Sequence, residues 1–139
     1  ILIVVSDYYE DVSNNLIIGA KNYLINECNQ DSTSIEVKKV SGCFEIPYCI
    51  NLYDSFDAYI ALGCIIRGET YHFELIANEV TRKIMDLSVD KKKPVGFGIL
   101  TCENHEQALK RSDPKKGNKG KEAAYACFSL LKDTINAKL

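Results

Sequence analysis

A histidine that follows a short turn is the first place in this chain where chemistry could occur. Residues 68–72 read Gly-Glu-Thr-Tyr-His, between an apolar run and a segment with helical spacing. The free N–H groups and positive dipole end of that helix would favour an anion such as phosphate. His72 is expected about one turn inside the helix, and an imidazole at that place could pass protons beside the anion. These local features fit a catalytic histidine and an incidental one equally well.

Polar and aromatic residues also follow two other apolar runs. Tyr8 and Tyr9 come after the first run, where two rings could stack on a planar ligand or simply face solvent. Gly42 and Glu45 come after the second. Gly42 would permit an unusual backbone turn, whereas a glutamate at a helix N-terminus, as expected of Glu45, is more often a dipole partner than a ligand contact.

Two glycine-based nucleotide motifs are absent from the sequence. Residues 117–121 read Gly-Asn-Lys-Gly-Lys, but the Walker spacing is not met and no strand leads directly into this segment. The dinucleotide pattern Gly-x-Gly-x-x-Gly follows none of the apolar runs. A nucleoside triphosphate site and a dinucleotide site are therefore not supported. His105, in an exposed-looking context, is interpreted as incidental.

These residues must be positioned by alternating strands and helices. Short runs rich in aliphatic and β-branched residues predict buried strands at residues 1–5, 35–40, 58–64 and 95–101. Helical spacing predicts helices at residues 14–28, 45–53, 71–87, 103–111 and 119–138. Ser13 is the expected N-cap of the first helix, and Pro47 is tolerable only in the first turn of the second.

The alternation predicts an α/β fold, specifically a three-layer α/β/α sandwich around a doubly wound, parallel, four-stranded sheet of flavodoxin-like topology. A chain of 139 residues is expected to form one domain over residues 1–139. Such sheets bind ligands outside the carboxyl ends of their strands, which is where the residues above are found.

The composition of the chain limits the classes of partner that it is expected to bind. The net charge is −2 and the lysines are mostly scattered, so nucleic acid is not expected as a partner. No apolar run approaches the length of a membrane span, which argues against a membrane partner. The six cysteines form no Cys-x-x-Cys pair, which predicts buried free thiols in a reducing compartment and a cytoplasmic protein. The sequence starts at Ile1 without an initiator methionine, so native residues are expected to precede it.

Three segments together resemble the lumazine synthase family. They are residues 42–47 (Gly-Cys-Phe-Glu-Ile-Pro), residues 62–73 (Leu-Gly-Cys-Ile-Ile-Arg-Gly-Glu-Thr-Tyr-His-Phe), and residues 106–120, which begin Glu-Gln-Ala and end Gly-Asn-Lys-Gly. The resemblance extends over nearly the whole chain. It implies an enzyme of riboflavin biosynthesis that condenses 5-amino-6-ribitylaminouracil with 3,4-dihydroxy-2-butanone 4-phosphate. The products would be 6,7-dimethyl-8-ribityllumazine, phosphate and water, and no metal or organic cofactor would be needed.

The resemblance also implies roles for individual residues. His72 would be the catalytic proton shuttle, and Tyr8 would stack on the pyrimidine ring. Phosphate would be bound by Glu69, Thr70, Arg111 and Lys119. The remaining substrate contacts would be the ribityl-binding segment Cys43, Phe44 and Glu45, the pyrimidine-reading backbone of Cys64, Ile65 and Ile66, and Phe97 from a neighbouring subunit.

The family resemblance further implies a homo-oligomer with active sites between adjacent subunits. The expected unit is a pentamer. The segment from Arg111 to Gly120, as short as in shell-forming members, favours a sixty-subunit (60-mer) icosahedral shell and leaves a pentamer or a decamer open. The family's amino-terminal strand would be missing from this chain. Besides the two small-molecule substrates, riboflavin synthase is a candidate partner. Three other functions remain open at this point: a flavin or pterin carrier, a structural shell subunit, and an archaeal-type riboflavin synthase.

Overall fold

A four-stranded parallel sheet forms the centre of the molecule. The structure, a computed structural model, describes residues 1–138. The strands pair in the order β2-β1-β3-β4, and they are β1 (Leu2–Ser6), β2 (Glu36–Val40), β3 (Tyr59–Ile66) and β4 (Val95–Cys102). All three pairings are parallel, so the four carboxyl ends meet at one edge of the sheet. The predicted flavodoxin-like α/β fold is confirmed.

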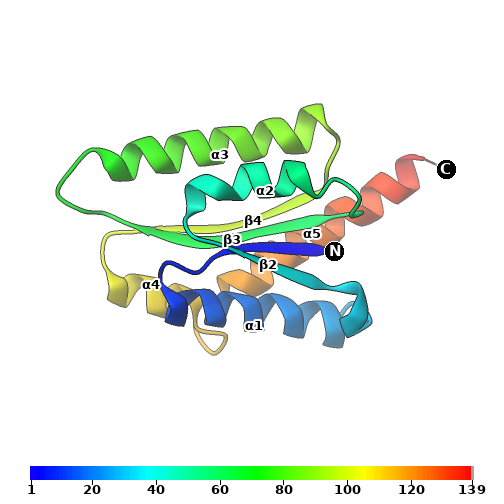
Figure 1. The fold of residues 1–139 in the computed structure, drawn as a ribbon. Coiled ribbons are helices and arrows are strands. Elements are labelled where there is room, and N and C mark those ends of the chain that lie inside the picture. The colour runs from blue at the N-terminus through cyan, green and yellow to red at the C-terminus, as the bar shows by residue number, and fades with distance from the viewer. Residues whose placement is uncertain (139) are drawn as a thin grey trace.

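Helices cover both faces of the sheet (Figure 1). One face carries α2 (Ile46–Leu52) and α3 (His72–Asp90), and the other carries α1 (Glu10–Asn26), α4 (His105–Ser112) and α5 (Lys119–Ala137). Two short 3-10 turns, Ser32–Ser34 and Cys43–Glu45, lie at the two ends of β2. Pro47 lies in the first turn of α2, as expected.

The hydrophobic core is divided by the sheet into two halves. On the α1 side, Ile3, Val5 and Leu62 pack against Leu16 and other residues of the helices. On the α2–α3 side, Leu2 and Val4 pack with residues of those two helices. The central strands β1 and β3 are buried on both faces because a parallel sheet is covered by helices on both sides. This two-sided burial gives the carboxyl edge of the sheet a well-packed support.

Two local predictions about the first half of the chain were wrong. Strand β2 is not buried: it is a sheet edge, and Glu36 and Lys39 are exposed. Ser13 is not the N-cap of α1, because the helix begins at Glu10, after Tyr9. Instead, Ser13 lies in the first turn, and the single proton of its Oγ is within hydrogen-bond reach of two acceptors, the backbone oxygens of Ser6 and Tyr9. Its hydroxyl therefore ties the helix to the end of β1.

The carboxyl edge of the sheet gathers the connections that carry the chemistry-bearing residues. Strand β3 runs to Ile66, two residues beyond its predicted end, so Ile65 and Ile66 belong to the strand. Helix α3 extends to Asp90, three residues further than predicted. The connection between β3 and α3 projects beyond the sheet at this edge (Figure 1).

Candidate active site

A pocket of about 670 Å³ lies over the carboxyl ends of β1, β2 and β3. Eight residues singled out from the sequence line it together: Tyr8, Cys43, Phe44, Glu45, Cys64, Ile65, Ile66 and His72. They come from three separate strand-to-helix connections. The parallel pairing of the strands brings these connections to one place, as the sheet topology predicted.

The aromatic wall of the pocket follows β1. Tyr8 is 72% exposed, and its ring meets that of Tyr9 edge to face, with 4.9 Å between centroids. Burial, followed by the neighbouring Tyr8, raises the pKa of Tyr9, so its phenol stays neutral around neutral pH. Because most of the Tyr8 side chain is exposed, the ring is available to stack on a planar ligand.

The turn after β2 differs in conformation from the sequence prediction. Gly42 has an ordinary extended backbone, with φ −149° and ψ 169°, so the expected unusual turn is wrong. The glycine instead leaves room for Glu45, because a Cβ atom at position 42 would lie 3.0 Å from the Glu45 Oε2 atom. The backbone N–H of Glu45 donates to the Gly42 oxygen at 3.3 Å. The turn therefore presents Phe44 and Glu45, both exposed, at the rim of the pocket.

Buried thiols form the floor of the pocket. The Cys43 Sγ lies 3.9 Å from the Cys64 backbone oxygen and can donate to it. Burial raises the pKa of the Cys43 thiol to about 11 and also raises those of Cys64 and Cys102. A protonated thiol is a poor nucleophile, so Cys43 and Cys64, the two thiols that line the pocket, shape it rather than attack substrate.

All six cysteines are unpaired, and five of them are buried, which agrees with the predicted buried free thiols. Cys28, on the loop after α1, is half-buried. Ser6 also lies beneath the pocket at 1% exposure, and its hydroxyl has no hydrogen-bond partner within the described chain.

His72 is the first residue of α3 rather than a residue one turn inside it. Its side chain lines the pocket, and the residue is exposed. Its backbone N–H donates to Thr70 Oγ1 at 3.3 Å, so the threonine side chain satisfies a backbone N–H group at the start of the helix. The histidine can therefore reach a ligand that lies over β3 while its backbone belongs to the helix start.

Three predicted residues lie elsewhere in the same chain. Phe97, Arg111 and Lys119 line a second pocket of about 280 Å³ along β4, the other edge strand of the sheet. Lys119 Nζ is 2.8 Å from a carboxylate oxygen of Glu122, which shares this pocket. Glu69 and Thr70 are exposed and are not among the residues lining either pocket. A single chain thus brings His72 and Arg111 to different surfaces.

The structure adds residues to the site that sequence reasoning did not select. Only their positions in the sequence could have indicated them. Ser6 is the last residue of β1, Ser41 starts the turn after β2, and Ile76 is one helical turn beyond His72. Glu122 lies in a helical segment that matches no functional motif. Its spacing of three residues from Lys119 in α5 was the only available signal.

Sheet order and pocket position together define the chain as a flavodoxin-like α/β protein with a pocket at the carboxyl edge of its sheet. The family model described as 6,7-dimethyl-8-ribityllumazine synthase matches residues 1–134. The chain belongs to this family.

Curated relatives agree with the family match. The 6,7-dimethyl-8-ribityllumazine synthase of Novosphingobium aromaticivorans is 46% identical over 133 residues, covering 94% of this chain and 92% of the relative. The synthase of Bartonella tribocorum is 43% identical over 135 residues, covering 94% of this chain and 87% of the relative. The activity is accordingly that of a 6,7-dimethyl-8-ribityllumazine synthase in riboflavin biosynthesis, which confirms the predicted function. None of the helices within residues 1–138 is long and apolar enough to cross a membrane.

Proposed function

We propose that the pocket around Tyr8 and His72 binds 5-amino-6-ribitylaminouracil. Tyr8 stacks on the pyrimidine, and the backbone of Cys64, Ile65 and Ile66 reads its polar edge. The ribityl chain lies along Cys43, Phe44 and Glu45, where the Glu45 carboxylate accepts hydrogen bonds from hydroxyl groups. The support for this arrangement is that all these residues surround one pocket, with an exposed aromatic ring at one side and a carboxylate at another.

The reaction requires proton transfers beside a departing phosphate. The amine of the uracil attacks the ketone, and His72 shuttles protons while the carbinolamine loses water to become an imine. A proton then leaves carbon as phosphate departs, and ring closure with a second loss of water gives the lumazine. Glu69 and Thr70 form the phosphate-binding turn at the start of α3, where backbone N–H groups favour an anion. Because two molecules must be held together, proximity supplies much of the acceleration.

A neighbouring subunit completes the site by supplying Phe97, Arg111 and Lys119. The observation that carries this proposal is their position in a pocket separate from that of His72 within one chain. Arg111 and Lys119 bind the phosphate and stabilise its negative charge as it leaves, and Phe97 closes over the pyrimidine. The active site then lies at each boundary between two copies of the chain.

Exposed apolar side chains on α2 and α3 support a homo-oligomer, with a pentamer as the proposed unit. Large apolar side chains on these two helices are more than half exposed, namely Tyr48, Leu52, Leu75, Met85 and Val89. The two helices cover the same face of the sheet (Figure 1). Exposed apolar side chains gathered on one face of a molecule are typical of a surface that a second copy covers.

Subunit complementation tests the shared site. Ser41→Trp fills the pocket of one copy from an exposed position on its wall, and Arg111→Ala removes the arginine of the other pocket. Each variant alone should make lumazine far more slowly than the parent. After unfolding and refolding in equal amounts, about a quarter of the boundaries should combine two intact halves and recover activity. A mixture no more active than the average of the two variants would show that both halves act within one chain.

A further inference from the structure

We propose that Arg67 is a positioning residue that fixes the turn formed by residues 67–71 and thereby the placement of Thr70 and His72. The proposal deepens the phosphate site of the proposed function and rests on it. Arg67 lies directly after the last residue of β3, before the turn begins. It acts through the turn and does not itself touch substrate.

The Arg67 side chain joins three structural elements. Its Nη1 donates to the Glu74 carboxylate in the first turn of α3, and its Nε donates to Glu103 Oε2 at 2.9 Å. Its guanidinium also lies over the Phe73 ring, 4.4 Å from the centroid. The backbone N–H of Arg67 donates to the Cys102 oxygen at 2.9 Å. The start of α3 is thereby held to the end of β4 across the base of the turn.

The rest of the turn has few other attachments. Residues 68–72 are all exposed, and the turn projects beyond the sheet edge (Figure 1). Within the described part of the chain, the hydrogen bonds of these residues are local: His72 N–H to Thr70 Oγ1, and Leu75 N–H to the Tyr71 oxygen. Around Gly68, a Cβ atom would meet nothing within 4 Å. Arg67 is therefore the main cross-link between this turn and the body of the protein.

Charge compensation keeps Arg67 from acting as a phosphate ligand. Two carboxylates face one guanidinium, so the cluster as a whole is negative and does not attract a dianion. Two hydrogen bonds hold the pKa of Glu74 below its usual range: first the one from the backbone N–H of Glu74 itself, then the one from Arg67. This carboxylate therefore stays ionised. A lysine could not replace the arginine fully, because a single ammonium cannot present a planar fork to two carboxylates and also stack on a ring.

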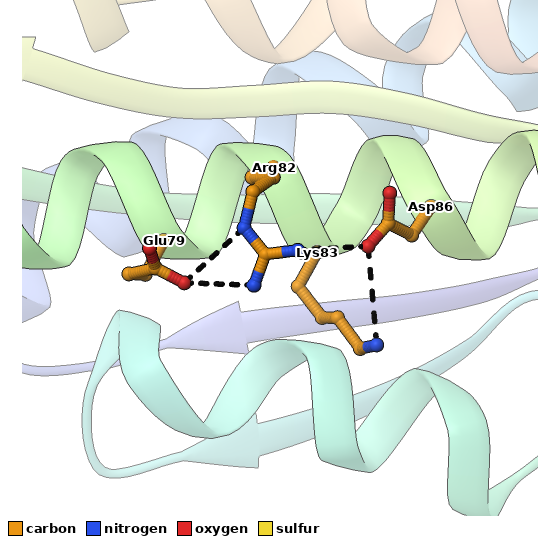
Figure 2. A network of polar contacts seen from close by, with 4 residues as sticks. All are labelled: Glu79, Arg82, Lys83 and Asp86. Carbon is orange, nitrogen blue, oxygen red and sulfur yellow. Dashed lines mark hydrogen bonds and ion pairs between the residues drawn. The ribbon is translucent and has the colours of Figure 1, made fainter.

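A matched control lies on α3, the helix that follows the turn. Arg82 in α3 also joins two carboxylates, with Nη2 2.8 Å from Glu79 and Nη1 3.1 Å from Asp86 (Figure 2). Its side chain is 59% exposed, compared with 41% for Arg67. All of its ion-pair partners lie within α3, so Arg82 cross-links no second element. Removing it deletes an equivalent exposed ion pair without releasing the turn.

The test compares Arg67→Gln, Arg67→Lys and Arg82→Gln in the full chain, using steady-state kinetics and inhibition by inorganic phosphate. A misplaced turn should raise the KM for the butanone phosphate and the inhibition constant of phosphate about 5- to 10-fold in Arg67→Gln. The KM for the ribitylaminouracil should change less than twofold, and Arg67→Lys should fall in between. Arg82→Gln should match the parent.

Two results would overturn the proposal. One is a parent-like phosphate inhibition constant in Arg67→Gln. The other is an equal rise of both KM values together with a lower unfolding temperature, which would mean a purely structural role. Arg111→Gln separates this failure from failure of the proposed phosphate site. If Arg111→Gln weakens phosphate inhibition and Arg67→Gln does not, only the positioning role is wrong. If neither variant weakens it, the phosphate site itself is wrong.

Discussion

Tyr8 offers a direct test of ligand stacking, because its ring contributes little to the fold. The side chain is 72% exposed and its aromatic contact is the edge-to-face one with Tyr9. Tyr8→Ala should therefore change the free energy of unfolding by less than about 0.5 kcal/mol. Stacking of a base on an aromatic side chain contributes about 1–3 kcal/mol. The variant should therefore bind the lumazine product about 5- to 150-fold more weakly.

Two further substitutions separate stacking from simple coverage of the pocket. Tyr8→Phe keeps the ring and should bind the product like the parent. Tyr8→Leu keeps apolar volume but loses the aromatic quadrupole, which is worth about 0.5–1.5 kcal/mol, so its affinity should fall between those of the phenylalanine and alanine variants. Equilibrium dialysis, read by lumazine absorbance, gives the dissociation constants. Parent-like affinity in Tyr8→Ala would refute the assignment of this ring to the pyrimidine.

Three other predictions concern the second pocket, alkaline stability and the core. Arg111→Gln should lower kcat/KM for the butanone phosphate about 100-fold, because a charged donor to the leaving phosphate is lost; steady-state rates equal to those of the parent would contradict this role. Burial raises the pKa of Cys43 from 9.0 to about 11, so the folded state holds this proton more tightly than the unfolded state. The resulting stabilisation, about 2–3 kcal/mol, is complete below pH 9 and is lost as the pH rises through 11. In urea unfolding at several pH values, the free energy of unfolding should fall less steeply at alkaline pH for Cys43→Ala than for the parent. Equal slopes in the two proteins would argue against this role of the Cys43 thiol. Leu62→Ala should cost about 2–5 kcal/mol in urea unfolding, because Leu62 is 0% exposed in the central strand β3; a loss below 1 kcal/mol would mean that the core closes around the cavity.

The overall fold was predictable because its signals are local and repeated. Each central strand is a short aliphatic run, and each helix has a spaced apolar face, so the alternation alone specifies a parallel sheet covered on both sides. What the local pattern does not contain is the position of a strand within the sheet. Residues 35–40 have enough β-branched side chains to indicate a strand, but their exposure depends on being at an edge.

Helix starts were harder to predict from residue type. Ser13 has the side chain of an N-cap, but its hydroxyl bonds to backbone oxygens of Ser6 and Tyr9 while the helix begins earlier, at Glu10. The same hydroxyl can cap a helix or bond back to a carbonyl, and tertiary packing decides between them. At His72 the error was about one turn, and it matters because the first residue of a helix faces the pocket differently from a residue deeper inside.

The site was predictable where its residues follow strands and unpredictable where they depend on another surface. Tyr8, Glu45 and His72 come from different connections, and parallel topology alone brings them together. Arg111 follows no strand but lies in the last turn of α4, and it lines the pocket beside β4. Proximity to the carboxyl edge does not determine which side of that edge a side chain faces. That choice depends on how α4 and α5 pack, which no short motif encodes.

The burial of five cysteines has a practical consequence for spectroscopy. Cys28 is the half-buried exception, and it lies just after the C-terminal end of α1, at the edge of the sheet opposite the pocket. A maleimide dye added under native conditions should therefore attach at this one position without any engineered cysteine. The native thiols thus supply a single labelling point, remote from the pocket around Tyr8 and His72, for energy-transfer measurements that test the proposed oligomer.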